Sequence, residues 1–259
     1  MSESRPFVRV ERRGAVGIAA LDRPDKRNAL DLPTRAALAA AIIELVKDAS
    51  IGAIVVTGSD KVFAAGADVG LLAEQDAAGV LALDFRQYWA PLLACTKPLV
   101  AAVSGMALGA GCELAMMCDF IVADASARFG QPEIRLGIIP GAGGTQRLVR
   151  TVGKQVAAMM VLTGEPISGE RAFQLGLVAD LAESGATLTR AVELADKAAA
   201  MAPLAMKAAR RVLAEGPDLP LGDALARENG EFVALFDTED QTEGMRAFLE
   251  KRAPRYQGK

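Results

Sequence analysis

The sequence predicts an α/β fold with a largely parallel sheet, followed by a helical segment. Up to about residue 180, short β-branched apolar runs alternate with stretches of helical periodicity, the pattern of strands joined by crossover helices. From residue 187 onward the periodicity is helical, with no strand between the helices. The length of 259 residues, 51% of them hydrophobic and 24% charged, fits one large globular domain or a domain with an appendage.

Local signals define the first elements. Residues 7–10 and 15–21 flank an Arg-Arg-Gly turn and predict an antiparallel hairpin. After a polar connection, Asp31 is expected to cap a helix over residues 33–47. The apolar face of this helix is expected to consist of Leu38, Ile42, Leu45 and Val46.

Later parts of the chain supply buried strands and more helices. Continuous short apolar runs are typical of strands covered on both faces, and they occur at residues 51–58, 97–105, 119–125 and 177–182. A glycine- and proline-rich loop over residues 127–153 is expected to lead into a helix. Further helices are predicted near residue 111 and at 153–163, 168–175, 187–202, 203–215, 219–236 and 239–252. Thr238 and Gln241 have the spacing of a capping box for the last helix.

Composition excludes several classes of protein. The net charge is −3 and basic residues are scattered among acidic ones, which argues against nucleic-acid or anionic-membrane partners. No apolar run approaches the roughly 20 residues needed to span a bilayer, and the N-terminal residues lack the apolar segment of a signal peptide. We therefore expect a cytoplasmic protein, with reduced thiols at Cys95, Cys112 and Cys118.

The absence of histidine narrows the possible chemistry. Ser-His-Asp catalysis, Cys-His catalysis and histidine-based metal sites are excluded. Acid–base work must then fall mainly to Asp, Glu, Lys, Cys or one of the two tyrosines.

Two glycine- and alanine-rich segments follow predicted strands and lead into helices, at residues 63–70 and 105–113. If these segments face each other, they offer paired N–H donors to one oxygen, as in an oxyanion hole. Close packing of helix on strand is the competing explanation, because it also requires small residues. A dinucleotide site is disfavoured because Leu114 occupies the third glycine position of GxGxxG. A Walker loop is disfavoured because no Lys-Ser/Thr follows residues 141–145.

Two glutamates lie in unusual surroundings. Glu113 is embedded in an apolar run, and Glu133 follows a proline in a glycine-flanked segment. Two carboxylates near one apolar pocket raise each other's pKa, and such a pair can exchange a proton near neutral pH. The alternatives are a favourable charge at a helix N-terminus for Glu113 and a salt bridge with Arg128 or Arg135 for Glu133.

The chain resembles the enoyl-CoA hydratase branch of the crotonase superfamily. The resemblance covers nearly the whole chain and rests on the blocks LDRPDKRNAL, IGAIVVTGSDKVFAAGADV, GMALGAGCELAMMCD, ARFGQPEIRLGIIPGAGGTQRL and TEDQTEGMRAFLEKR. It implies a crotonase-like spiral of ββα units over residues 1–195 and a helical C-terminal trimerisation segment over residues 196–259. It further implies homotrimers that pair as hexamers, acyl-CoA thioester substrates, and no metal or redox cofactor.

The resemblance also assigns roles to individual residues. Backbone N–H groups of Ala67 and Ala110 would hold the thioester oxygen, with Glu113 as base toward water and Glu133 as acid toward Cα. The residues expected to contact CoA or substrate are Lys26, Ala29, Ala65, Asp68, Val69, Gly70, Gly141 and Lys251. Ala110 departs from the glycine usual in the family, which adds a methyl group to the pocket and excludes most conformations with positive φ.

The function implied is reversible hydration of trans-2-enoyl-CoA to 3-hydroxyacyl-CoA, in fatty-acid or related acyl-CoA metabolism. Enoyl-CoA isomerisation or another crotonase-type reaction is the nearest alternative, although such enzymes often keep only one of the two glutamates. A non-catalytic relative that binds CoA or RNA is the alternative from another class. The acidic balance of the chain argues against RNA.

Overall fold

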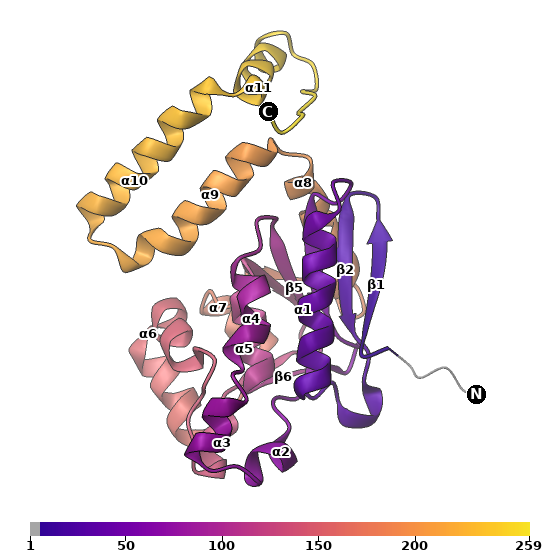
Figure 1. Ribbon diagram of the computed structural model, residues 1–259, viewed down its shortest axis with the longest axis vertical. Helices are drawn as coiled ribbons and strands as arrows, with labels where there is room; N and C mark the ends of the chain where they lie inside the picture. The colour runs from indigo at the N-terminus through magenta and orange to yellow at the C-terminus, as the bar shows by residue number, and fades with distance from the viewer. Residues whose placement is uncertain (1–5) are drawn as a thin grey trace.

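The computed structural model describes residues 6–259, and two sheets form its framework (Figure 1). In the larger sheet the strands lie in the order β1-β2-β3-β5-β7-β10. Only the pair β1 and β2 is antiparallel, as the hairpin prediction requires, and every other neighbouring pair is parallel. These strands are β1 (Val8–Arg13), β2 (Val16–Leu21), β3 (Ala53–Thr57), β5 (Leu99–Val103), β7 (Phe120–Ala123) and β10 (Asp180–Leu181).

The smaller sheet has the strand order β4-β6-β8-β9. Its strands are β4 (Val62–Ala64), β6 (Met106–Leu108), β8 (Arg128–Gly130) and β9 (Ile167–Ser168). Each successive pair, β3 with β4, β5 with β6 and β7 with β8, gives one strand to each sheet before the chain enters a helical segment. The predicted spiral of ββα units is therefore confirmed. The sequence pattern predicts a loop where β8 lies and no strand at β4, β6 or β9, because segments of two or three residues are too short to show a periodicity.

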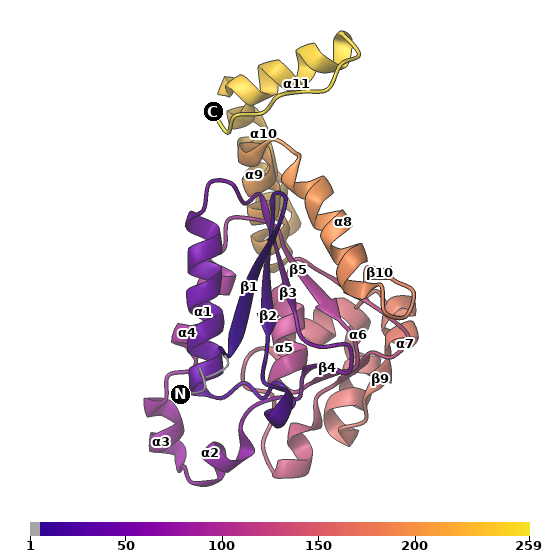
Figure 2. The same ribbon diagram turned by 90° about the vertical axis from the view of Figure 1, so that its right-hand side faces the viewer.

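Helices cover both faces of the larger sheet (Figure 2). Successive residues of a strand point to opposite faces, so Ile54 and Val56 face the core on the α1 side while Val55 packs on the side of α8. Helix α1 (Leu32–Lys47) begins at Asp31, whose carboxylate accepts a hydrogen bond from Thr34 N at 2.9 Å. This is the predicted cap. Helix α8 (Thr187–Ala199) covers the other face.

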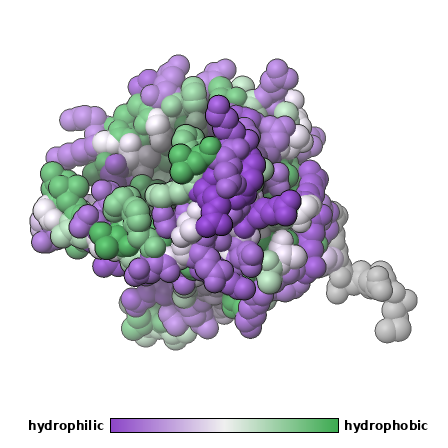
Figure 3. Space-filling view, turned by 90° about the horizontal axis from the view of Figure 1, so that it is seen from above, coloured by the Kyte–Doolittle hydropathy of each residue, from purple (hydrophilic) through white to green (hydrophobic). Residues whose placement is uncertain are grey.

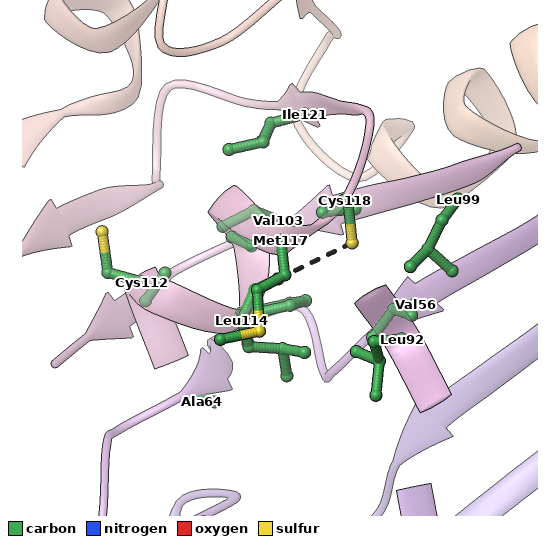
Figure 4. Packing of buried hydrophobic residues seen from close by; sticks show 14 of the residues in the cluster. Val56, Ala64, Leu92, Leu99, Val103, Cys112, Leu114, Met117, Cys118 and Ile121 are labelled. Carbon is green, nitrogen blue, oxygen red and sulfur yellow. Dashed lines mark hydrogen bonds between the residues drawn. The ribbon is translucent and has the colours of Figure 1, made fainter. Parts of the chain in front are cut away.

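Helix α5 (Ala110–Met117) lies in the core, with seven of its eight residues buried. Leu114 and Met117 pack among side chains of the larger sheet, and Cys118 Sγ donates to Leu114 O at 3.7 Å (Figure 4). The three cysteines are free and buried, as expected. The other helices of this part are α2 (Val69–Ala73), α3 (Ala77–Ala82), α4 (Arg86–Leu93), α6 (Gly144–Thr163) and α7 (Gly169–Gln174).

The C-terminal helices extend away from the sheets, at the opposite end of the molecule from α2 and α3 (Figures 1 and 2). They are α9 (Pro203–Glu215), α10 (Leu221–Ala234) and α11 (Glu239–Leu249). Thr238 caps α11 by accepting from Gln241 N at 3.1 Å. Seen from this end, exposed apolar side chains lie beside strongly polar ones (Figure 3). The predicted division at residue 195 falls within the last turn of α8 and, as a division into domains, stays a prediction.

Two further findings concern the helices. The helix expected at residues 153–163 is the second half of α6, which already begins at Gly144 and contains a non-helical residue, Gly153, with φ 77°. Across residues 6–259, no helix combines the length and apolar character needed to cross a membrane.

Candidate active site

A cavity of about 1210 Å³ brings together the four residues that carry the predicted chemistry, Ala67, Ala110, Glu113 and Glu133. It lies between the α1–α4 side of the molecule and the segments around α5 and α6. Most of its remaining wall is apolar, which is typical of small-molecule sites with a few convergent polar groups.

Glu113 occupies the first turn of α5 and is only 2% exposed. Its Oε1 accepts hydrogen bonds from Ala142 N at 2.7 Å and Gly144 N at 2.8 Å. Burial raises the pKa of this carboxyl group, and the two N–H donors and the charges of Arg35 and Arg147 partly offset that rise. The carboxylate thus also caps the N-terminus of α6.

Glu133 lies in a 3-10 turn, Pro132–Leu136, and lines the same cavity. Burial raises the pKa of its carboxyl to about 7, and the negative charge of Glu113 adds to the rise. With its amide oriented to donate, Gln131 reaches the two Glu133 oxygens at 3.1 and 3.2 Å. Two carboxyl groups with different environments therefore face one cavity, which is the usual arrangement for an acid and a base.

The raised pKa of Glu133 predicts a pH-dependent effect on stability. A carboxyl with a folded pKa of about 7 and an ordinary value of 4.5 binds its proton more tightly when folded. That stabilisation is complete below pH 4.5 and is lost as the pH rises through about 7. We expect Glu133→Gln to raise the thermal midpoint relative to wild type at about pH 8, and to leave it nearly unchanged at about pH 5. Glu170→Gln, at an exposed position, is the control substitution. If Glu133→Gln changes the thermal midpoint by the same amount at both pH values, the prediction is contradicted.

Ala67 and Ala110 both line the cavity, and their role as N–H donors to the thioester oxygen stays a prediction. Ala110 is the first residue of α5, so its N–H has no partner within the helix. Leu30 N donates to Gly66 O at 2.8 Å in a parallel bridge with Ala67, which turns the N–H of Ala67 to the side away from Leu30. Each of these alanines follows a glycine with positive φ, 118° at Gly66 and 51° at Gly109.

Glycine is required at two positions around these donors. A Cβ at Gly109 would lie 2.8 Å from Glu133 Oε1, and one at Gly111 would lie 2.2 Å from Ala64 O. Ala110, between them, is helical and buried, with 6% of its surface exposed. Alanine is therefore compatible with this backbone, and its methyl group forms part of the cavity wall.

Gly111→Ala tests the contact between α5 and β4. The added methyl group must push the helix away from the backbone of Ala64, so we expect a loss of about 1–3 kcal/mol in the free energy of unfolding. Denaturant titration measures it. Gly222→Ala in α10 is the matched control, because a Cβ there meets no atom within 4 Å and alanine favours a helix. Equal losses for the two variants would contradict this explanation.

Six of the predicted CoA-binding residues lie in the two segments that meet beside Ala67, which lines the cavity. Ala65 N donates to Arg27 O at 3.1 Å, which joins the loop of Lys26 and Ala29 to the segment 65–70. Asp68 caps α2 by accepting from Gly70 N at 2.9 Å, and Val69 and Gly70 are exposed. Gly141 lines the cavity near α6.

Lys251 is not brought to these residues. It lies two residues after the end of α11, at the opposite end of the molecule from α2 (Figure 1). A contact between Lys251 and CoA bound by the same chain is therefore not formed in this arrangement.

Sequence reasoning missed four polar residues at the site. Arg35, Trp89 and Arg147 line the cavity, and Gln131 is buried beside Glu133. A signal for Arg35 exists, because it is spaced three and seven residues before Leu38 and Ile42 and so falls on the apolar face of α1. The other three carry no comparable signal in the sequence.

Comparisons with known proteins agree with this fold. The family described as Enoyl-CoA hydratase/isomerase matches residues 11–259. A 2,3-dehydroadipyl-CoA hydratase of Escherichia coli is 48% identical over 96% of this chain and 98% of its own. A mitochondrial enoyl-CoA hydratase of Pongo abelii is 42% identical over 95% of this chain and 86% of its own. A crystal structure of an enoyl-CoA hydratase subunit I from Geobacillus kaustophilus superposes with a TM-score of 0.94 at 41% identity, covering 98% of each chain. This chain belongs to the enoyl-CoA hydratase/isomerase family.

Proposed function

We propose that this chain is an enoyl-CoA hydratase, a hydro-lyase that adds water reversibly across the C2=C3 bond of trans-2-enoyl-CoA thioesters. The observation that carries the proposal is the placement of Glu113 and Glu133 in one cavity with the N–H groups of Ala67 and Ala110. Full-length relatives named as hydratases support the same activity. Isomerisation needs only one carboxyl to move a proton along the acyl chain, so the second carboxyl favours hydration.

The thioester oxygen is bound by the N–H groups of Ala67 and Ala110. As water adds at C3, negative charge moves from the double bond onto this oxygen. Donors fixed by the backbone stabilise that charge without rearranging during the reaction. The positive end of the α5 dipole, which begins at Ala110, supports the same charge.

Glu113 acts as the base and Glu133 as the acid. Glu113 takes a proton from water while the water oxygen bonds to C3, and Glu133 gives its proton to C2. The two N–H donors to Glu113 favour its charged form, and a pKa of about 7 leaves Glu133 a proton to give near neutral pH. The proton on Glu113 then returns to Glu133 through solvent, which restores the starting state.

The CoA moiety lies along the loop of Lys26 and Ala29 and the segment of residues 65–70. Exposed Lys26 supplies a positive charge for phosphate. Lys251 contacts the CoA bound by a neighbouring subunit, because its own chain places it at the far end of the molecule.

The proposed assembly is a homotrimer that pairs into a hexamer. The C-terminal helices expose large apolar side chains that a solitary chain would leave in water: Leu213 is 76% exposed, Leu221 75%, Phe232 58%, Phe248 81% and Leu249 79%. Exposed apolar surface of this extent marks an interface. Sedimentation equilibrium tests the assembly, and a monomer at micromolar concentration would contradict it.

The cytoplasmic location also stays a prediction.

Hydration of crotonyl-CoA tests the activity. Loss of the conjugated thioester's absorbance follows the reaction, and 3-hydroxybutyryl-CoA identified by mass spectrometry confirms the product. We expect turnover with trans-2-enoyl-CoA esters of four to six carbons. Binding of these esters without turnover, for every chain length from C4 to C16, would contradict the proposal.

A further inference from the structure

The guanidinium group of Arg35 is a buried charge in the wall of the active-site cavity. The residue is 4% exposed, and it lines the cavity together with both glutamates. Its Nε donates to Leu30 O at 2.7 Å, and its guanidinium carbon lies 4.6 Å from the ring centres of both Phe85 and Trp89. These contacts fix the guanidinium plane in one orientation.

This charge has no carboxylate partner in the part of the chain that the structure describes, residues 6–259. No carboxylate oxygen there lies within 4.0 Å of Arg35. Asp31, the acidic residue nearest in sequence, is paired with Arg23 and caps α1. Removing a cation from water is costly unless an anion and hydrogen-bond acceptors replace the water.

The two Nη groups of Arg35 are therefore free to bind a ligand. Among residues 6–259, no hydrogen-bond acceptor contacts either Nη group. Neither Nη atom is fully buried, so each keeps some exposed surface. Because Arg35 lines the cavity, their remaining exposed surface opens onto it. The planar group offers two parallel N–H donors, the geometry that matches a carboxylate.

Trp89 contributes its ring to the same wall. It is 4% exposed and lines the cavity, and its Nε1–H is fully buried without an acceptor among the described residues. Buried polar groups usually have a partner. Because this N–H is fully buried, it does not reach the cavity, so on this part of the wall Trp89 supplies a ring surface and Arg35 supplies hydrogen-bond donors.

Arg35 lines the same cavity as the residues that would hold the reacting thioester. The thioester oxygen is held at Ala67 and Ala110, C3 lies at Glu113, and the charges of Glu113 and Arg35 are close enough to influence each other. An acyl chain that runs along the part of the wall formed by Phe85 and Trp89 meets Arg35, whose guanidinium group lies over both rings.

We propose that Arg35 binds a carboxylate at the far end of the acyl chain, which makes short 2-enoyl-CoA esters of dicarboxylic acids the preferred substrates. The inference rests on the proposed hydratase function and names the substrate class for that site. Arg147 is a weaker candidate because its Nη1 already donates to Ala142 O at 2.7 Å. Arg86 is exposed to solvent, where a carboxylate gains little by leaving water.

Two six-carbon substrates test the proposal with the wild-type protein. One is trans-2-hexenoyl-CoA, and the other is the same ester with a carboxylate in place of the terminal methyl group. We expect kcat/KM to be about 10- to 100-fold higher for the carboxylate ester, the range for a hydrogen bond to a charged group. Hydration of both esters without this preference overturns the substrate class but not the hydratase function. Hydration of neither ester, together with no turnover of the other enoyl-CoA esters named above, contradicts the hydratase function itself.

Substitution of Arg35 locates the recognition. We expect Arg35→Gln to lower kcat/KM for the carboxylate ester by about 10- to 100-fold, and to lower it by less than threefold for hexenoyl-CoA. Arg35→Lys, which keeps the charge but loses the planar pair of donors, should recover part of the preference. Arg86→Gln is the matched comparison. If the preference for the carboxylate ester disappears in Arg86→Gln but remains in Arg35→Gln, the assignment of the carboxylate to Arg35 is overturned.

A different role for Arg35 would leave a different signature. If it only keeps Glu113 ionised, Arg35→Gln lowers kcat/KM for both esters equally and shifts the acid limb of the pH profile upward. That result overturns the proposal. If the Arg35→Gln variant is too unstable to assay, the proposal is tested with the wild-type protein by comparing how strongly adipyl-CoA and hexanoyl-CoA inhibit hydration. We expect adipyl-CoA to bind at least about tenfold more tightly, and equal inhibition overturns the proposal.

Discussion

Glu113→Gln is expected to lower kcat for enoyl-CoA hydration by about 10²- to 10⁴-fold, the usual contribution of a general base. Glutamine has the same shape, so its Oε1 can keep the hydrogen bonds from Ala142 N and Gly144 N that hold α6 against α5. The amide nitrogen then replaces the other carboxylate oxygen and cannot accept a proton from water. Stopped-flow measurement of crotonyl-CoA hydration gives kcat, and thermal unfolding reports the fold.

Glu133→Gln provides the matched comparison. If Glu133 supplies the proton to C2, this variant should lose a similar factor, and the double variant should lose much less than the product of the two, because the carboxyl groups act as a unit. Binding of a saturated acyl-CoA, measured by calorimetry, should stay within a few-fold of wild type in all three. Rates within tenfold of wild type for both single variants would contradict the two-carboxylate mechanism.

The strands of the larger sheet could be predicted because their surroundings are uniform. Strands β3 and β5 are buried on both faces, so their sequences are continuous apolar runs. Strands β4, β6, β8 and β9 have only two or three residues and depend on pairing with segments far along the chain. Nothing local distinguishes them from turns. The spiral was recognisable only through the resemblance to a known family.

The site was predictable where a residue contradicts its local pattern. Glu113 contradicts an apolar helix, and the structure explains it by two backbone donors from residues 142 and 144. Those partners could not be foreseen, because the loop that supplies them approaches only in the folded protein. Arg35 contradicts the apolar face of α1 in the same way, because it lies on the face formed by Leu38 and Ile42. In both helices, a charge at a buried position marks a residue that lines the cavity.

Ala110→Pro is the second substitution with a large expected effect. Proline lacks the N–H that Ala110 directs to the thioester oxygen, and loss of one such donor costs about 10²- to 10³-fold in kcat. The position suits proline structurally, because Ala110 is the first residue of α5 and helices accept proline there. We therefore expect a large loss of hydration with a small change in the thermal midpoint.

Ala110→Gly is the matched control, because glycine keeps the N–H and removes only a methyl group from the cavity wall. It should retain hydration within a few-fold of wild type, with a modest loss of stability from the more flexible backbone. The proline ring also occupies space next to the oxygen site, so the KM for crotonyl-CoA should rise as kcat falls. If Ala110→Pro keeps kcat within tenfold of wild type, the N–H of residue 110 does not carry the charge that develops on the thioester oxygen, and Ala67 with the α5 dipole must do so instead.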